Sequence, residues 1–288
     1  MKSEDYEFVC QFLLRSSGLS LGTDKQYLVE SRLVPIAQSQ GMADLDELVA
    51  ALRMGRNPRL QSVVTEAMTT NETSFFRDKQ PFDDFKTHLL PELIESRRST
   101  QTLRIWCAAS STGQEPYSIL MLLAEEFPQL RNWKIELVAT DLATKALDRA
   151  GQGIYSHFEV QRGLPIRMLM KYFKQIPDGW QISEDLRKIV NWQQLNLLTD
   201  FSRLGQFDLV FCRNVLIYFD VETKRGIIER IRRLVRSPGF LILGAAESLL
   251  GLYDGFQRFS ECKSAVYRAA TIPAPAASKG TARTGIVS

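Results

Sequence analysis

The chain has 288 residues, of which 44% are hydrophobic and 24% are charged, as is usual for a globular protein of one or two domains. The formal net charge of +3 is too small to argue for nucleic-acid binding. No apolar run reaches the roughly 18 residues that cross a bilayer, and the acidic start MKSEDYEF is unlike a signal sequence, so we expect a cytoplasmic protein without direct membrane insertion. The four cysteines lie far apart and only two histidines accompany them, so the sequence predicts free thiols and no metal site.

Amphipathic helices dominate the first part of the chain. The segments YEFVCQFLL, KQYLVESRLVPIA, LDELVAAL and LQSVVTEAM have the apolar spacing of helices, and glycines or an Asn-Pro pair separate them. We therefore predict a small all-helical N-terminal domain over residues 1–75. A polar turn followed by further helical spacing predicts a linker helix over residues 76–100.

Short apolar runs typical of strands begin at Leu103. They recur as LRIWCA, KIELVATD, KIVNWQQLN, FDLVFCRNVL, FLILGAA and SAVYRAA, with helical segments between most of them. This alternation predicts an α/β domain over residues 101–270, with a mostly parallel sheet covered on both faces. Residues 151–193 break the rhythm and predict a small β-rich insertion, whereas residues 271–288 have almost nothing to bury and predict a disordered tail.

The first two strands carry the pattern of a nucleotide-type cofactor site. A strand, the small-residue turn ASSTG and a helix follow one another from Leu103 to Ser118, and the next strand ends in Asp141. Gly113 allows a ligand close to the backbone, and a carboxylate at 141 can accept hydrogen bonds from ribose hydroxyls. No GxGxxG or GxxxxGK[ST] phosphate loop is present, so the pattern favours an adenosine without phosphates, as in S-adenosylmethionine. An ordinary α/β turn followed by a surface aspartate has the same sequence pattern.

Two further segments have polar residues in unusual places. TTNETSFFR places Asn71, Thr73 and Arg77 just before the first strand, although a capped helix start with a surface arginine is an alternative explanation. FCRNVLIYFD ends a buried strand in Arg-Asn, which is expected where the carboxyl end of the strand opens into a site.

Taken together, the segments TNETSFFR, WCAASSTGQEPYS, ATD, LNLL and FCRNVLIYF resemble, in order and spacing, the chemotaxis receptor methyltransferases of the CheR family. The resemblance runs from about residue 5 to about residue 270. It implies a small helical N-terminal domain, a Rossmann-like class I methyltransferase sheet over 101–270 and an inserted β-subdomain. Two departures from the family pattern, CAASSTG and Gln114, are small or isosteric, and they bear on cofactor affinity more than on activity.

The resemblance also implies which residues form the site. Contact with the cofactor is implied for Asn71, Thr73, Arg77, Glu115, Asp141, Asn196, Leu197, Arg213 and Asn214. Within this set Asp141 would bind the ribose, Asn196 and Leu197 would flank the adenine, and Arg213 with Asn214 would line the methionine end. Arg77 and Tyr218 are the implied catalytic residues, although Tyr218 as an aromatic that packs the helix after the strand is an alternative.

The implied reaction is esterification of glutamate side chains on transmembrane chemoreceptors for sensory adaptation. S-adenosylmethionine would be the methyl donor and S-adenosylhomocysteine the product. A glutamate is already ionised near neutral pH, so its carboxylate needs no general base, and the enzyme has to position and desolvate it. Arg77 is our candidate for orienting that carboxylate, and Tyr218 for contact with the carboxylate or the sulfonium.

The implied partner is the cytoplasmic helical bundle of the receptors, which is acidic, and we expect a monomeric enzyme. The candidate basic contacts in the helical domain are Lys25, Arg32, Arg53, Arg56 and Arg59. Residues 1–90 hold 10 basic and 13 acidic side chains, so a scatter of solvated arginines is an equal alternative. In some family members the inserted β-subdomain binds a receptor C-terminal peptide, and nothing in this sequence decides that point.

Three other functions remain open on the sequence alone. A binding protein that senses S-adenosylmethionine without turnover would be expected to lack Asp141, Arg77 or Tyr218, and all three are present. A methyltransferase for a small-molecule acid would more often have a lid than a helical domain and an insertion. A receptor array with an output other than swimming would use the same chemistry.

Overall fold

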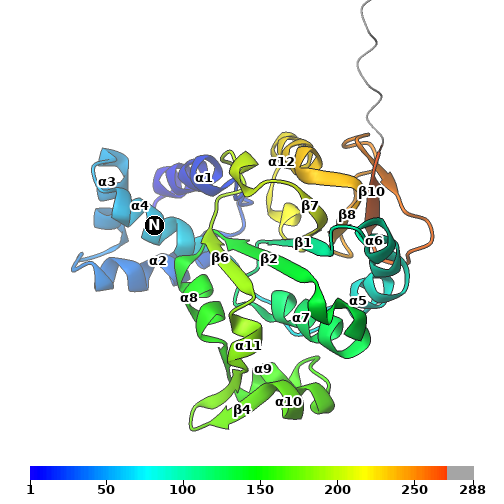
Figure 1. Ribbon diagram of the computed structural model, residues 1–288. Coiled ribbons are helices and arrows are strands. Elements are labelled where there is room, and N and C mark those ends of the chain that lie inside the picture. Colours follow the sequence, from blue (N-terminus) through cyan, green and yellow to red (C-terminus); the bar gives the residue numbers. More distant parts are fainter. Residues whose placement is uncertain (271–288) are drawn as a thin grey trace, which may run out of the picture.

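The computed structural model describes residues 1–270, and the tail predicted for 271–288 lies outside the described residues. Figure 1 shows a group of helices at one end of the molecule, a central sheet, and a small β-containing unit that projects from it. Within residues 1–270, no helix is both long enough and apolar enough to cross a membrane.

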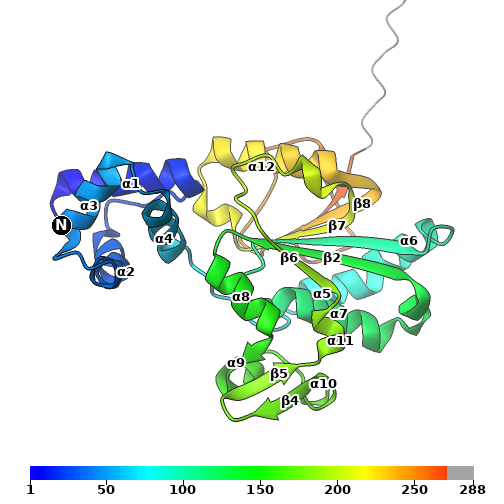
Figure 2. The ribbon, with the colours of Figure 1, turned by 60° about the vertical axis from the view of Figure 1, so that its left-hand side comes forward.

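The group of helices is built from α1 (Ser3–Ser17), α2 (Gln26–Ser39), α3 (Leu45–Met54) and α4 (Pro58–Met68). They enclose a core of their own, in which Val9, Leu13, Val29, Leu33 and Leu48 are fully buried. Side-chain caps begin the third and fourth helices, because Asp44 and Asn57 accept hydrogen bonds from backbone N–H groups of the first turn. Figures 1 and 2 place this unit at the opposite end of the molecule from α6 (Leu90–Ser96).

The central sheet has seven strands in the order β6-β2-β1-β7-β8-β10-β9. Their bounds are β1 (Thr102–Ala108), β2 (Lys134–Asp141), β6 (Val190–Gln194), β7 (Phe207–Cys212), β8 (Val235–Leu243), β9 (Phe256–Arg258) and β10 (Val266–Ala269). The pairs from β6 to β8 are parallel, whereas β10 pairs antiparallel with β8 and β9. The predicted α/β fold with a mostly parallel, Rossmann-like sheet is therefore confirmed.

Helices cover both faces of this sheet, as Figure 2 shows. One face packs against α5 (Gln80–Asp84), the π-helical turn Phe85–Leu89, α6 and α7 (Gln114–Glu126). The other face packs against α12 (Val221–Leu234) and the 3-10 helix at Ser202–Leu204. Further short elements are α8 (Thr144–Gln152) and the 3-10 helices at Pro128–Asn132 and Leu216–Tyr218. Because both faces are covered, the strands are apolar almost throughout, as parallel strands usually are.

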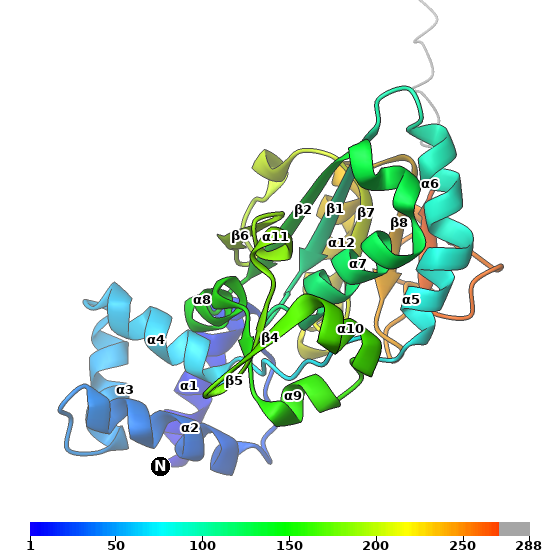
Figure 3. The same cartoon turned by 60° about the horizontal axis from the view of Figure 1, so that its bottom comes forward.

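The projecting unit lies between α8 and β6 in the chain. It contains β3 (Ile154–Tyr155), α9 (His157–Gln161), α10 (Ile166–Tyr172), β4 (Phe173–Ile176), β5 (Gly179–Ile182) and α11 (Glu184–Arg187). Its three strands form a separate antiparallel sheet in the order β3-β5-β4. Figures 1 and 2 show α9, α10 and the β4-β5 hairpin on the α7 side of the molecule, and Figure 3 shows the same unit turned toward the viewer. We call this unit, residues 153–187, the insertion.

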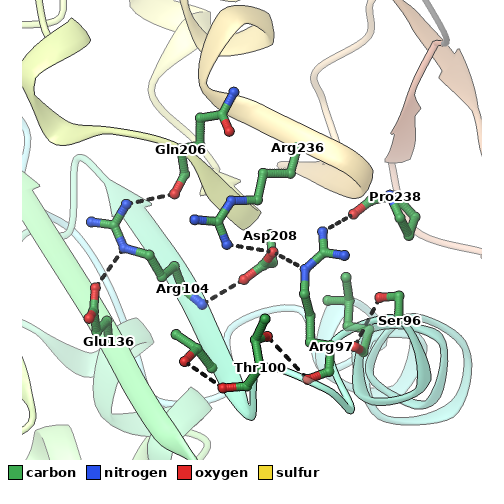
Figure 4. Close-up of polar contacts among 11 residues, drawn as sticks. Ser96, Arg97, Thr100, Arg104, Glu136, Gln206, Asp208, Arg236 and Pro238 are labelled. Atoms are coloured by element: carbon green, nitrogen blue, oxygen red, sulfur yellow. Dashed lines mark hydrogen bonds and ion pairs between the residues drawn. The ribbon is translucent and has the colours of Figure 1, made fainter.

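A cluster of charged residues closes the amino-terminal end of the sheet (Figure 4). The Asp208 carboxylate, at the start of β7, is fully buried and accepts hydrogen bonds from Arg97 Nε at 2.7 Å, from the Arg104 N–H at 2.8 Å and from Arg236 Nη1 at 3.3 Å. Arg104 Nε in turn donates to Glu136 Oε2 at 2.6 Å. The cluster thus connects α6, β1, β7 and β8 at the end of the sheet away from the cavity described next.

Candidate functional site

A cavity opens at the carboxyl ends of β1, β2 and β7, where open α/β sheets bind their ligands. The space within it, including its opening to solvent, is about 1010 Å³. All ten residues proposed from the sequence line this one cavity: Asn71, Thr73, Arg77, Glu115, Asp141, Asn196, Leu197, Arg213, Asn214 and Tyr218. They come from five separate parts of the chain, so the fold brings together what the sequence keeps apart.

The turn after β1 forms one wall of the cavity. Ala109 and Ser111 have φ of 55° and 51°, and Gly113 has φ of 93°. A Cβ atom on Gly113 would lie 2.9 Å from the Ala150 Cβ, so the close approach of α7 to α8 requires a glycine here. The Ser111 N–H donates to Asp141 Oδ2 at 2.8 Å, which ties this turn to the end of β2.

Asp141 is a buried carboxylate held by the backbone. Its other oxygen, Oδ1, accepts a hydrogen bond from the Ala143 N–H at 2.9 Å. Burial raises the pKa of the Asp141 carboxyl, and the N–H donors of Ala143 and Ser111 work against that increase. A carboxylate has about four acceptor positions, and backbone groups occupy two of them. The remaining positions suit the two hydroxyl groups of a ribose.

Arg213 forms the buried floor of the cavity. Its side chain is 2% exposed, with Nη1 2.7 Å from Glu115 Oε2 and Nη2 2.8 Å from Asp78 Oδ2. Nη2 also donates to the Arg77 carbonyl at 2.8 Å. Burial raises the pKa of the Glu115 carboxyl, and the Arg213 guanidinium counteracts this rise. Arg213 therefore braces the segment around Arg77, a role that the sequence did not indicate.

The segment that carries Asn71, Thr73 and Arg77 crosses one side of the cavity. The Ser111 hydroxyl donates to the Asn71 carbonyl at 2.7 Å, and Arg77 Nη1 donates to the Glu72 carbonyl at 2.8 Å. Left-handed φ values at Phe76, Asp78 and Lys79, of 50°, 65° and 50°, mark this stretch as strained. Strained backbone of this kind persists only where surrounding contacts hold it, as the Arg213 contacts do here.

The helical unit contributes a wall that the sequence reasoning missed. Ser17 and Leu19, at the end of α1 and just after it, line the cavity. Asn196 Nδ2 donates to the Ser16 carbonyl at 2.6 Å, and the Ser20 N–H donates to the Tyr218 carbonyl at 3.0 Å. The Asn196 amide, expected beside the adenine, therefore also fastens the helical unit to the sheet. In the sequence, Ser17 and Leu19 flank Gly18, which looks like an ordinary helix stop, and no local signal distinguishes them as part of a site.

The lining suits an adenosine that carries a charged amino-acid end. Ser110 Oγ and Arg213 Nε are buried and have no hydrogen-bond partner within residues 1–270, so both can serve a ligand. Leucines and Phe219 supply apolar surface for a base, and the acids Glu72, Glu115 and Asp141 give the lining the negative charge that suits a cationic ligand. These features fit S-adenosylmethionine.

Comparisons with known proteins agree with this geometry. Residues 71–266 match the family described as "CheR methyltransferase, SAM binding domain", and residues 4–69 match "CheR methyltransferase, all-alpha domain". Chemotaxis protein methyltransferase 1 of Pseudomonas aeruginosa is 44% identical over 269 residues, which cover 92% of this chain and 97% of that protein. Chemotaxis protein methyltransferase Cher2 of Pseudomonas putida is 41% identical, over 92% of this chain and 98% of that protein. Chemotaxis protein methyltransferase 1 of Vibrio cholerae is 38% identical, over 89% and 94%. The chain therefore belongs to the CheR family of S-adenosylmethionine-dependent methyltransferases.

Proposed function

We propose that this chain methylates glutamate side chains on the cytoplasmic helical bundle of transmembrane chemoreceptors, and so adjusts receptor sensitivity. The observation that carries the proposal is that Arg77 lines the same cavity as Asp141. A residue suited to orient a carboxylate therefore lies beside a residue suited to hold an adenosine. The names of the relatives, all chemotaxis protein methyltransferases, support the receptor as the substrate.

The residues of this chain would bind and orient, because S-adenosylmethionine supplies a methyl group on a sulfonium that is already a good leaving group. Asp141 would hold the ribose hydroxyls, and Ser110 with the Glu115–Arg213 pair would lie toward the amino-acid end. The substrate glutamate is ionised at neutral pH, so no side chain has to remove a proton from it. The work left to the protein is to align the carboxylate with the methyl carbon and to exclude water.

Arg77 is the residue proposed to align the substrate carboxylate. Among the described residues its guanidinium donates one hydrogen bond, to the Glu72 carbonyl, so the remaining N–H groups of this cavity-lining residue are available to a substrate. A forked hydrogen bond from these groups would orient one carboxylate. Tyr218, whose side chain lines the same cavity, is proposed to contact the carboxylate or the sulfonium.

Three of the five basic side chains proposed to contact the receptor already have partners in this chain. Arg32 Nη1 donates to the Met68 and Thr69 carbonyls, Arg53 pairs with Asp5 at 3.0 Å and Lys25 pairs with Asp24 at 2.8 Å. These three are therefore already engaged within the helical unit.

Arg56 and Arg59 are exposed and form no ion pair with any residue between 1 and 270. Arg59 lines a groove together with Lys145 and Asn71, and Asn71 also lines the cofactor cavity. We propose that an acidic receptor helix approaches the cavity along this groove.

The decisive experiment is transfer of radiolabel from methyl-labelled S-adenosylmethionine to membranes that contain chemoreceptors. Label should appear on the receptor with the wild-type protein, should leave as methanol under base, and should fall at least tenfold with Arg77→Ala and with Asp141→Ala. Arg98→Ala, an exposed arginine at the far end of the sheet, is the matched control and should label normally. A cofactor-binding protein that labels no receptor would contradict the proposal and favour the sensing protein.

A further inference from the structure

A buried carboxylate behind the cavity gathers an unusual set of backbone donors. Glu247 follows β8 and is 7% exposed. Its Oε1 accepts from the N–H groups of Val215 at 3.0 Å, Leu216 at 2.7 Å and Ile217 at 3.3 Å, and its Oε2 accepts from those of Asn214 at 2.9 Å and Gly244 at 2.7 Å. Four of these five donors are successive residues of the turn after β7. That turn carries Asn214, Val215 and Tyr218 into the lining of the cavity.

We propose that Glu247 is a positioning residue for the cofactor, because its carboxylate fixes the turn that presents Asn214 and Tyr218 to the cavity. The inference rests on the proposed function for its place in catalysis, but cofactor binding alone is enough to test it. Glu247 itself does not line the cavity, so it acts through the turn.

The shape of the turn depends on an acceptor at this place. Asn214 has φ of 58°, a left-handed conformation that is uncommon outside glycine and that asparagine tolerates better than most residues. Four consecutive N–H groups that point to one side of a turn need a shared acceptor, because buried donors without partners are strongly unfavourable. The Glu247 carboxylate meets that need for all four. Without it, the turn would relax toward a shape in which its N–H groups find other acceptors, and Asn214 and Tyr218 would move with it.

The contacts also explain why the residue is a glutamate. In glutamine, one of the two oxygens becomes an NH2 group, and in either orientation of the amide that group would face at least two backbone N–H donors. Aspartate is shorter by one methylene and would not reach both sets of donors. No lysine, arginine or histidine in the described part of the chain forms an ion pair with Glu247, so backbone dipoles alone balance its charge.

Gly244 is part of the same arrangement. A Cβ atom on this residue would lie 2.8 Å from the Asn214 N and 2.8 Å from Glu247 Oε2. The end of β8 can therefore approach the turn after β7 only with a glycine at this position. Gly244→Ala should displace the turn while leaving the Glu247 carboxylate in the chain, which provides a second and independent variant.

The competing explanation is that Glu247 only stabilises the fold. In that case a variant would contain less folded protein, so the apparent kcat would fall while the KM for S-adenosylmethionine and the Kd for S-adenosylhomocysteine stayed as in the wild type. A positioning role predicts a change in the folded molecules, with both of these constants raised.

The test compares Glu247→Gln with Asp208→Asn in the full chain. Asp208 is also a buried carboxylate that accepts several hydrogen bonds, but it lies at the opposite end of β7 (Figure 4). Calorimetry should give a Kd for S-adenosylhomocysteine about tenfold or more above wild type for Glu247→Gln. The KM for S-adenosylmethionine should rise in parallel. Asp208→Asn should lower the Tm and leave the Kd unchanged.

A Kd for Glu247→Gln within twofold of wild type would overturn the inference. If Glu247→Gln does not fold, Gly244→Ala decides, since an unchanged Kd in that variant would also overturn it. A wild-type protein that binds S-adenosylhomocysteine but labels no receptor would contradict the proposed function, and the ratio of Kd values would still test Glu247.

Discussion

The carbonyl oxygen of Phe75 lies so close to Gly163 that a Cβ atom on residue 163 would stand 2.1 Å from it. The Phe75 ring is fully buried and meets the rings of Tyr155 and Phe173 edge-on, with centroids 5.0 Å and 5.6 Å away. The insertion is thus packed directly against the segment that carries Thr73 and Arg77. A displacement of the insertion would be expected to displace that segment as well.

Replacing Gly163 with alanine should separate the insertion from this segment. The added Cβ cannot be accommodated beside the Phe75 carbonyl, so we expect a loss of about 1–3 kcal/mol in the free energy of unfolding and a weaker affinity for S-adenosylhomocysteine. Gly41→Ala is the matched control, because Gly41 also has a left-handed φ, of 72°, but has nothing within 4 Å of the added Cβ. Urea unfolding and calorimetry measure both effects. Equal losses in the two variants would mean that backbone strain alone, and not the contact, is responsible.

Asp141→Asn should weaken cofactor binding. In either orientation of the amide, its NH2 group would face a backbone N–H donor, of Ser111 or of Ala143, and one acceptor oxygen would remain for the ribose hydroxyls in place of two. Charged hydrogen bonds contribute about 1.5–3 kcal/mol each, so the Kd for S-adenosylhomocysteine should rise by about tenfold to 100-fold. Asp220→Asn, which changes an exposed helix cap with a similar backbone contact, should leave the Kd at the wild-type value. Similar Kd values for both variants would rule out the ribose contact.

The two ion pairs of Arg213, with Glu115 and with Asp78, should contribute very different amounts to the free energy of unfolding. Arg213→Met leaves the Glu115 carboxylate buried without its partner, and we expect a loss of about 3–5 kcal/mol in urea unfolding. Asp78 is 37% exposed, so solvent screens its attraction, and Asp78→Asn should lose about 1 kcal/mol or less. The double variant Arg213→Met, Glu115→Gln should recover part of the loss. If the double variant lost as much free energy of unfolding as the two single variants together, the Arg213–Glu115 pair would not be coupled.

The Asp84 carboxyl should make stability depend on pH in the acidic range. Burial raises its pKa, but hydrogen bonds from the Ser264 N–H at 2.7 Å and hydroxyl at 2.5 Å, together with one from Gln80, outweigh burial, and the net pKa is lower than usual. A carboxyl whose pKa is lower in the folded state stabilises the fold above its unfolded pKa of about 3.9, and this stabilisation is lost as the pH falls through the folded pKa.

Asp84→Asn should therefore be less stable than wild type at pH 7, and the difference should shrink below about pH 4. Urea unfolding from pH 7 to pH 3 measures this. Asp83→Asn, at an exposed neighbouring position, should match the wild type throughout. A difference between Asp84→Asn and wild type that stays constant over this range would contradict the assignment.

Local sequence patterns were sufficient to predict six of the seven strands of the central sheet, without β9, and the place of the cavity. Strand-like runs that end in Asp141 or in Arg213-Asn214 identify the carboxyl edge of a parallel sheet, and side chains at that edge must lie close together. No sequence pattern indicated the contacts that support the cavity-lining residues from behind. Glu247 lies in the segment GAAES, which resembles no binding motif. Its role arises only because β8 lies beside β7 in the sheet. Asp78 likewise looks like a surface charge until Arg213 is seen beneath it.

The wall formed by Ser17 and Leu19 gives the cavity a property that a pocket within one folding unit would not have. One side belongs to the helical unit and the other to the sheet, so the cavity exists only while the two units are together. A ligand that touches both sides adds its binding free energy to their association, which at 100 times the Kd amounts to about 2.7 kcal/mol. Cofactor binding and the association of the two units are therefore thermodynamically linked. The free energy that holds the helical unit against the sheet is greatest when the cofactor is bound.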